Sequence, residues 1–440
     1  MIPGRRWVWQ SRNVTTFRHE SLLSHRVEEA MSPSMDPFFK ELGHTVAERW
    51  KRANFSLDAF PGIALAVLEE RPPSEHVDLP ALMREFLLED DQPQQSQSGF
   101  GQPEVIAFDH PKFYIQLLFW MEGTTDIHQH EFSGAFHVLF GSSIHALYTF
   151  ENAQSITPHF RTGDIRMEQI ELLETGRTVP IVSGRECIHS LFHLDMPSVT
   201  VVVRTQHDPG TGPQFNYLPP HVAFDPIYND ALTLRRKQLL DVLEQIEDPS
   251  YPELIREMVA DLDLERGFFI LQSCMGPLQQ LDEWEETLAV YEAKHGSAAA
   301  GVSATLEENV RREIIKELRG AIAEPELRFF LALLMNVPTR QDLLAMVGQR
   351  FPEEPPVETV LRWAGELGGI SEECHAILDA EFPDVPGIPE KEQPGIFLAV
   401  LRHFLEGGSH LSSSLTGLSA AELGEIRAAF EGSSLSVLVR

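Results

Sequence analysis

The chain has 440 residues, of which 42% are hydrophobic, and this length predicts two or three domains that each bury their own core. The formal net charge of -31 disfavours nucleic acid and membrane lipid as partners, because so acidic a surface repels both. Three scattered cysteines that match no disulfide or metal-ligand spacing, with no evident signal peptide or membrane span, predict a cytoplasmic protein: Cys187, Cys274 and Cys374.

Residues 1–100 are expected to form a mainly helical N-terminal region that ends in a linker. Asp36 and Pro37 can start a helix, because proline is tolerated in the first helical turn. A second, shorter helix fits residues 79–88, and the Gln-, Ser- and Pro-rich stretch 89–103 is predicted to be a linker or mobile loop. The first helix carries four apolar residues at helical spacing: Phe39, Leu42, Val46 and Trp50.

Residues 101–224 differ in character and are predicted to form an antiparallel β-barrel or jelly roll. Short runs rich in Val, Ile, Phe, Tyr and Thr are broken by Gly and Pro, as is typical of such folds. Residues 208–220, which contain Pro-Gly and Gly-Pro steps, are expected to be a loop. The expected strands include residues 113–120, 135–140, 144–150, 165–173 and 199–205.

Residues 225–440 are expected to form an α-helical C-terminal domain, either a bundle or a stack of helical hairpins. Residues 296–301 are predicted to be a loop between two of the helices. The fold class is therefore α+β, with a central barrel flanked by N- and C-terminal helical regions. The clearest helices are expected at residues 231–247, 280–294, 305–321, 326–335, 341–350, 357–367 and 397–406.

Two histidines separated by one residue follow the apolar strand 113–120. In the run Gly-Thr-Thr-Asp-Ile-His-Gln-His, His128 and His130 project from one face of a strand, because strand side chains alternate. On an inward face, both imidazoles can reach one metal ion. A third ligand can come from His189 in Gly-Arg-Glu-Cys-Ile-His-Ser-Leu-Phe-His, where a turn at Gly184 leads into another strand.

These two motifs, Gly-x4-His-x-His and Gly-x4-His-x3-His, resemble the characteristic motifs of the cupin superfamily. The run from Lys112 to Gly123, in which a strand ends at Trp120 just before the histidine pair, is most similar to the cysteine dioxygenase branch. The resemblance covers about residues 105–207. It implies a double-stranded β-helix in which three histidines hold Fe(II) for the addition of O2 to a small thiol. The implied ligands in this chain are His128, His130 and His189.

The chain also departs from the pattern of that branch. Gly134 stands where most cupins have a glutamate ligand, which is consistent with a three-histidine site. Some thiol dioxygenases have a cysteine that is cross-linked to tyrosine, and the corresponding position in this chain falls near Ala135. His193 takes the asparagine position of the second motif, and the late-strand Ser-His-Tyr set is replaced by Val202, Arg204 and Gln206.

Other residues are candidates for catalysis or substrate binding. Arg204 is costly to bury unless it is paired, so it either binds a substrate carboxylate through two hydrogen bonds or points to solvent. His193 is a candidate acid or base or a structural residue, and Tyr148 is a candidate for the pocket wall. Tyr114 and Gln116 lie where related enzymes place substrate-binding groups, unless they face outward.

The leading hypothesis is a mononuclear non-haem Fe(II) oxygenase, a dioxygenase-like oxidoreductase that acts with O2 on a small polar or anionic substrate. Imidazole ligands alone do not select iron, so Zn, Mn, Ni and Cu remain alternatives. The alternative functions are a metal- or ligand-binding regulatory cupin without turnover and a Zn- or Mn-dependent isomerase or hydrolase on the same barrel. The helical regions are expected to shape access to the barrel and to form an interface for a homo-oligomer or a protein partner.

Overall fold

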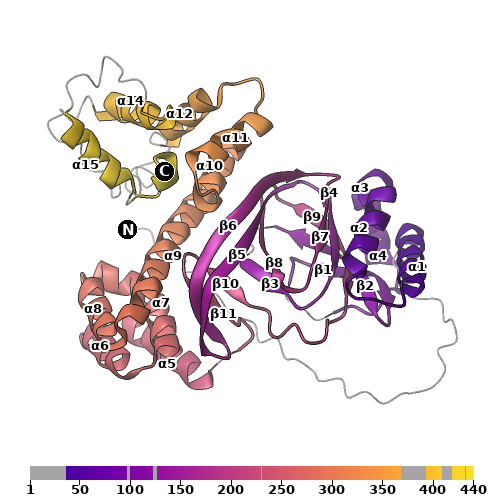
Figure 1. The fold of residues 1–440 in the computed structure, drawn as a ribbon, viewed down its shortest axis with the longest axis horizontal. Coiled ribbons are helices and arrows are strands. Elements are labelled where there is room, and N and C mark those ends of the chain that lie inside the picture. The colour runs from indigo at the N-terminus through magenta and orange to yellow at the C-terminus, as the bar shows by residue number, and fades with distance from the viewer. Residues whose placement is uncertain are drawn as a thin grey trace.

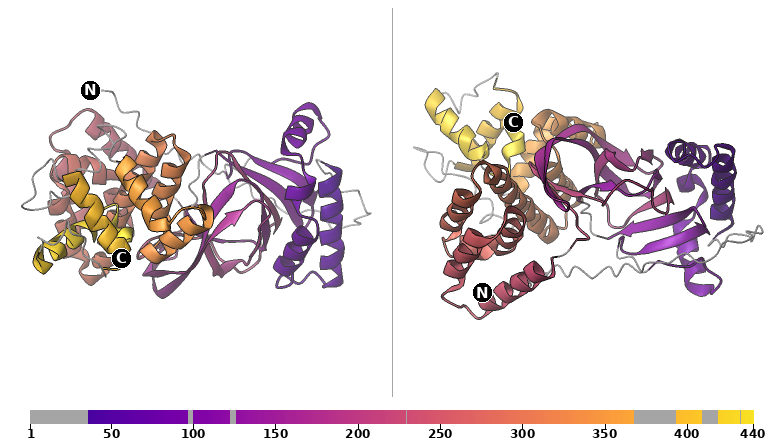
Figure 2. Two further views of the ribbon diagram at one scale, coloured as in Figure 1. Left: turned by 90° about the horizontal axis from the view of Figure 1, so that it is seen from above. Right: turned by 60° about the horizontal axis from the view of Figure 1, so that its bottom comes forward.

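The computed structural model describes residues 36–96, 100–121, 126–228, 230–367, 393–408, 419–431 and 433–440. These residues form an α+β fold in which two antiparallel sheets lie between an N-terminal and a C-terminal set of helices (Figure 1, Figure 2). The predicted fold class is therefore confirmed, and the sheets are consistent with a cupin-like fold. The third cysteine, Cys374, lies outside the described residues.

The strands of the described residues divide into a five-stranded sheet and a closed ring of six strands. The sheet has the order β1-β2-β9-β4-β7, and the ring has the order β10-β11-β6-β5-β8-β3. The strands are β1 (Glu104–His110), β2 (Phe113–Trp120), β3 (Ile127–His130), β4 (Gly134–Phe140), β5 (Ser142–Thr157), β6 (Phe160–Glu174), β7 (Thr178–Ile181), β8 (Gly184–His193), β9 (Ser198–Thr205), β10 (Asn216–Leu218) and β11 (Val222–Phe224).

The ring strands separate two apolar interiors, because their side chains alternate between two buried faces. One interior, here called the intersheet core, lies between the sheet and the ring and consists of Leu118, Trp120, Phe132, Phe136, Val138, Leu173, Ile181, Leu191 and Val202. The other, here called the ring core, draws on the ring strands β3, β5, β8, β10 and β11 and consists of Ile127, Ala146, Tyr148, Phe150, Ile188, Phe215, Tyr217 and Ala223.

A short hairpin closes the ring at residues where the sequence predicted a loop. β10 lies within the predicted loop 208–220, and β11 follows it. Asn216 of β10 is paired with both Phe224 of β11 and His128 of β3, while β11 pairs with β6. Strands of three residues are too short to show alternation, so their sequence carried no strand signal.

The N-terminal helices cover the outer face of the five-stranded sheet (Figure 2). Asp36 caps the first helix by accepting a hydrogen bond from the Phe38 backbone N–H. The predicted apolar stripe of this helix is buried against sheet residues such as Phe113 and Ile115. An unpredicted helix at Phe60–Glu70 is apolar over most of its length, so it shows little amphipathic periodicity. The helices are α1 (Pro37–Arg52), α2 (Phe60–Glu70), α3 (Pro73–His76) and α4 (Leu79–Leu88).

His137 of β4 lies on this outer face of the sheet and is fully buried. One ring nitrogen bonds the Thr178 hydroxyl at 2.8 Å, and the other bonds the Ser74 hydroxyl at 2.9 Å. Burial lowers the pKa of His137 to about 4. Because an unfolded histidine titrates near pH 6.5, the unfolded state gains a proton in the pH range where folded His137 stays neutral.

We therefore predict that His137 makes the protein less stable as the pH falls from about 6.5 to 4. Linkage sets the loss at roughly 3 kcal/mol for this residue, since the unfolded state binds one more proton over that range. In the variant His137→Gln, denaturation midpoints should change less between pH 7 and pH 4.5 than in the wild type. Parallel pH profiles for the two proteins would contradict the assignment.

The C-terminal region is helical, as predicted, but its boundaries differ from those expected. The predicted loop 296–301 is wrong, because Ser297 already begins α9 and the following alanines are strong helix formers. Three α-helices, at Tyr251–Asp261, Leu264–Gln280 and Ala420–Glu431, were not predicted. The helices are α5 (Ala231–Gln245), α6 (Tyr251–Asp261), α7 (Leu264–Gln280), α8 (Trp284–His295), α9 (Ser297–Ala321), α10 (Pro325–Asn336), α11 (Arg340–Arg350), α12 (Pro356–Leu367), α14 (Gln393–Leu405), α15 (Ala420–Glu431) and the 3-10 helix η3 (Ser436–Leu438).

Part of this helical region packs on the ring strands. Ile144 of β5 and Phe192 of β8 belong to the same hydrophobic cluster as Phe330 of α10. Arg319 of α9 donates hydrogen bonds to the backbone carbonyls of His193 and Leu194. In Figure 1, α9 runs beside β6 and leads into α10. Within the described ranges, no helix has the length and apolar character required to cross a bilayer.

Candidate metal centre

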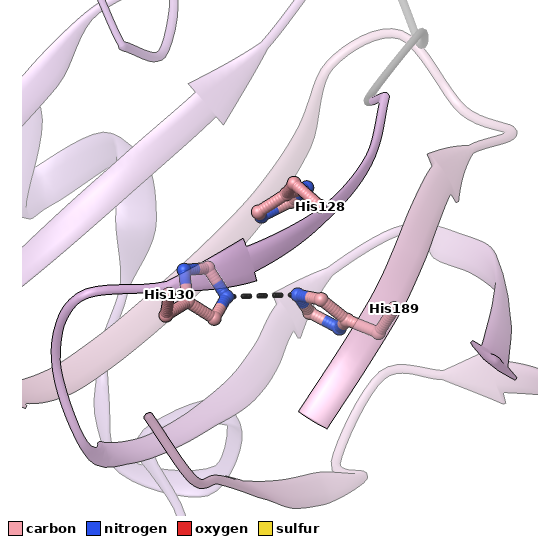
Figure 3. A group of neighbouring side chains, drawn as sticks. All are labelled: His128, His130 and His189. Carbon is pink, nitrogen blue, oxygen red and sulfur yellow. Dashed lines mark hydrogen bonds between the residues drawn. The ribbon is translucent and has the colours of Figure 1, made fainter. Parts of the chain in front are cut away.

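Three histidines from two paired strands of the ring converge on the face that borders the intersheet core (Figure 3). His128 and His130 project from β3, and His189 projects from β8. His128 and His189 are direct partners across the ladder, which brings their imidazoles together. One potential ligand atom from each of the three side chains lies within 4.8 Å of the others, and all three residues are at most 5% exposed.

The cluster faces the intersheet core. His130 packs against Phe132 at 4.3 Å between ring centroids, and His189 lies 6.3 Å from Phe136 of β4. Their neighbours on β3 and β8, Ile127 and Ile188, belong to the ring core on the opposite face. The structure therefore places the histidines between the two sheets, whereas the closed six-stranded ring surrounds a different, apolar interior.

A local irregularity of the backbone adjoins the site. The pairing of β3 with β8 shifts between His128, which faces His189, and His130, which faces Gly184. Gly184 begins β8 with a φ of +76°, in the region that favours glycine. The glycine turn predicted before His189 is thus present.

The histidine surroundings favour the neutral imidazole, which is the form that binds metal. Burial is the main cause that lowers the pKa of His128, His130 and His189, and neighbouring histidines lower the pKa of the latter two further. The backbone carbonyl of Asp126 lies 2.8 Å from Nδ1 of His128 and can accept a hydrogen bond from its Nδ1–H. Nε2 of His128 then carries a lone pair, and it has no hydrogen-bond partner among the described residues. These donor atoms fit a divalent ion that takes nitrogen ligands.

Arg204 lies on the sheet opposite the cluster, on the face that borders the intersheet core. Its guanidinium carbon lies 3.4 Å from the centroid of the Phe132 ring, and the same ring packs against His130 at 4.3 Å between centroids. The guanidinium donates to the backbone carbonyls of Thr205 and Gln206 at 3.3 Å. Burial lowers the pKa of Arg204, although a guanidinium stays charged at neutral pH.

Two neighbours of Arg204 on β2 share this face. Tyr114 is the direct strand partner of Arg204, and its ring lies 5.0 Å from the guanidinium carbon. Gln116 is paired with Val202 of the intersheet core and is only 1% exposed. Its side-chain oxygen has no hydrogen-bond partner among the described residues. A positive charge and an amide therefore face the same interior as the three imidazoles.

His193 lies on the same face of β8 as His189 but four residues further along. That spacing corresponds to about 13 Å on an extended strand. Its ring stacks on Trp120 at 4.7 Å, and Nδ1 bonds the hydroxyls of Ser143 and Ser198. Burial lowers the pKa of His193 to about 3, so this imidazole stays neutral. The structure separates His193 from the histidine cluster and does not bring it to the ligands.

Tyr148 projects from the other face of its strand. It is paired with Ile188, belongs to the ring core, and its hydroxyl lies 3.3 Å from that of Ser190. The interior face of β5 instead carries His145, which is 2% exposed and lies 3.2 Å from Nδ1 of His189. His145 was not among the residues predicted for the site. Strand alternation could have identified it as an alternative to Tyr148, because residues 145 and 148 cannot share a face of a regular strand.

No protein-family model and no curated protein matches this chain. Among solved structures, it is similar to TT1209 from Thermus thermophilus, with 17% identity and a TM-score of 0.18 over 26% of this chain and 91% of that one. It is similar to the DMSP lyase DddQ from Ruegeria pomeroyi DSS-3, with 15% identity and a TM-score of 0.22 over 41% and 95%. A match to the DMSP lyases RdDddP and RnDddQII has 14% identity and a TM-score of 0.20 over 39% and 95%.

Proposed function

We propose that His128, His130 and His189 hold one divalent metal ion and that this ion is iron. We further propose that the protein is an oxygenase for a small anionic substrate. The observation that carries the proposal is the convergence of three buried imidazoles from two paired strands. Held by these three histidines, Fe(II) would supply the redox chemistry that O2 requires. Three neutral ligands leave the full charge of the ion in place.

The residues around the cluster suit a substrate that carries a negative charge. Arg204 offers the guanidinium of the facing sheet, which matches the geometry of a carboxylate. Gln116 offers a buried amide oxygen that can accept one further hydrogen bond. Phe132 and Phe136 border the cluster and limit the access of water to it.

The first experiment is elemental analysis of protein purified without added metal, beside the triple variant His128→Ala, His130→Ala, His189→Ala. Near-stoichiometric iron that is lost in the variant supports the oxygenase and leads to an O2-consumption screen over small thiols and carboxylic acids. Zinc, manganese or nickel redirects the proposal to an isomerase or hydrolase on the same barrel. Absence of metal from both proteins, even after addition of Fe(II), overturns the site and leaves a regulatory barrel.

The role of Arg204 gives a separate prediction within that screen. For an active acid, Arg204→Met should lower kcat/KM by about 10- to 100-fold, since a charged hydrogen bond contributes roughly 1.5–3 kcal/mol. The uncharged amide of the same compound should be affected much less, and the metal content should stay unchanged. Equal losses for the acid and the amide would assign Arg204 to packing on Phe132 instead.

A further inference from the structure

A row of hydrogen bonds links the histidine cluster to a partly exposed carboxylate. Oε1 of Glu171 on β6 lies 3.3 Å from Nδ1 of His145. Nε2 of His145 lies 3.2 Å from Nδ1 of His189. Nε2 of His189 lies 2.8 Å from Nε2 of His130. Four side chains from four strands thus form one continuous row, and its outer end, Glu171, has a side chain that is 28% exposed.

The row has a direction, because an ionised carboxylate can only accept hydrogen bonds. Glu171 therefore accepts from Nδ1–H of His145, which leaves Nε2 of a neutral His145 as an acceptor. His189 must then donate through Nδ1–H, and its Nε2 becomes the atom with the free lone pair. In the metal-free protein, that lone pair accepts from Nε2–H of His130. The tautomers follow from the network as a whole, not from any single contact.

Two further observations agree with this direction. Nδ1 of His130, where the row ends, is buried and has no hydrogen-bond partner among the described residues, as expected for an acceptor left over. The hydrogen bond to His145 is also the largest cause that lowers the pKa of the Glu171 carboxyl, so Glu171 is ionised at neutral pH. His145 is 2% exposed and packs against Phe136, so water cannot readily replace it.

We propose that Glu171 and His145 are positioning residues that hold His189 in the Nδ1–H tautomer and keep its Nε2 lone pair directed at the metal. This inference rests on the proposed metal site. His128 has a comparable acceptor of its own in the carbonyl of Asp126. His189 depends instead on two ionisable side chains, which substitution can alter. Mutation of residues that hydrogen-bond to a metal ligand typically lowers the affinity for the metal by about 10- to 100-fold.

The test begins with the tautomers of the metal-free protein, labelled with ¹⁵N-histidine and examined by long-range ¹H–¹⁵N correlation. The wild type should show His189 protonated at Nδ1. Glu171→Ala and His145→Leu should give a mixture with the Nε2–H form. His145→Gln should preserve the wild-type pattern, because its amide oxygen can accept from Nδ1–H of His189. Protonation of wild-type His189 at Nε2 overturns the proposal.

Metal affinity, measured by competition with a chelator, is the second readout. It should fall about 10- to 100-fold in Glu171→Ala and His145→Leu and much less in His145→Gln. Glu174→Ala is the matched control, since Glu174 is an exposed carboxylate on the same strand. The effects of Glu171→Ala and His145→Leu should not add in the double variant, because both act through one contact. Equal losses in His145→Gln and His145→Leu contradict a role through the tautomer.

The two readouts separate this inference from the proposed function. If His189 has the expected tautomer in the wild type and loses it in Glu171→Ala, the positioning row stands even when no divalent ion binds. That outcome overturns only the metal site. If an ion binds to the wild type and to every variant with the same affinity, the metal site stands and the positioning role is overturned.

Discussion

Replacing His189 alone by alanine is expected to lower the affinity for the metal ion by about 10²- to 10³-fold. Four-ligand zinc sites contribute about 10–16 kcal/mol in total, so one ligand corresponds to roughly 2.5–4 kcal/mol. The loss should be large because His189 is the ligand from the second strand, without which only His128 and His130 remain. Affinity can be measured by chelator competition, and metal content by elemental analysis.

His193→Gln is the matched control, since this histidine lies on the same strand and is also buried. Its hydrogen bonds go to Ser143 and Ser198, so the variant should retain the metal even if its thermal stability falls. The far-UV circular dichroism of both variants shows whether each is folded. A folded His189→Ala protein that binds metal as tightly as His193→Gln would exclude His189 as a ligand.

The second large effect is expected at Gly134, the first residue of β4. A Cβ atom placed on Gly134 would lie 2.0 Å from the carbonyl oxygen of Val203 and 2.9 Å from Cα of Arg204. Both atoms belong to the backbone of the neighbouring strand β9, so they cannot move aside as a flexible side chain would. Gly134→Ala should therefore cost about 3 kcal/mol, at the upper end for overpacking.

Thermal denaturation at a fixed scan rate measures this effect, and a fall in midpoint of about 5 °C or more is expected. Gly62→Ala is the control, since the added Cβ would meet no described residue within 4 Å outside its own stretch of helix, and alanine favours the helix. Gly134→Glu should be at least as unstable and should not gain a fourth ligand. A Gly134→Ala variant as stable as the wild type would contradict the close approach of the β4 backbone to the β9 backbone.

Sequence patterns of short range predicted much of the architecture. The stripe of Phe39, Leu42, Val46 and Trp50 predicted the buried face of α1, because helical periodicity maps directly onto one face. The alternation of strands predicted that His128 and His130 share a face, and spacing after Gly184 pointed to His189 as their partner. The convergence of these three residues could be predicted because two motifs, each local, specify it.

Tertiary structure alone decided the rest. Whether a strand face borders the intersheet core or the ring core depends on the closure of the ring by β10 and β11, which have no sequence signal. The same closure placed Tyr148 in the ring core and left His145 beside His189. Glu171 joins that row only because β6 pairs with β5 in one register, a contact between residues 26 positions apart. Parity along a strand is a local property, but which side of the strand becomes the site depends on the neighbours that cover each face.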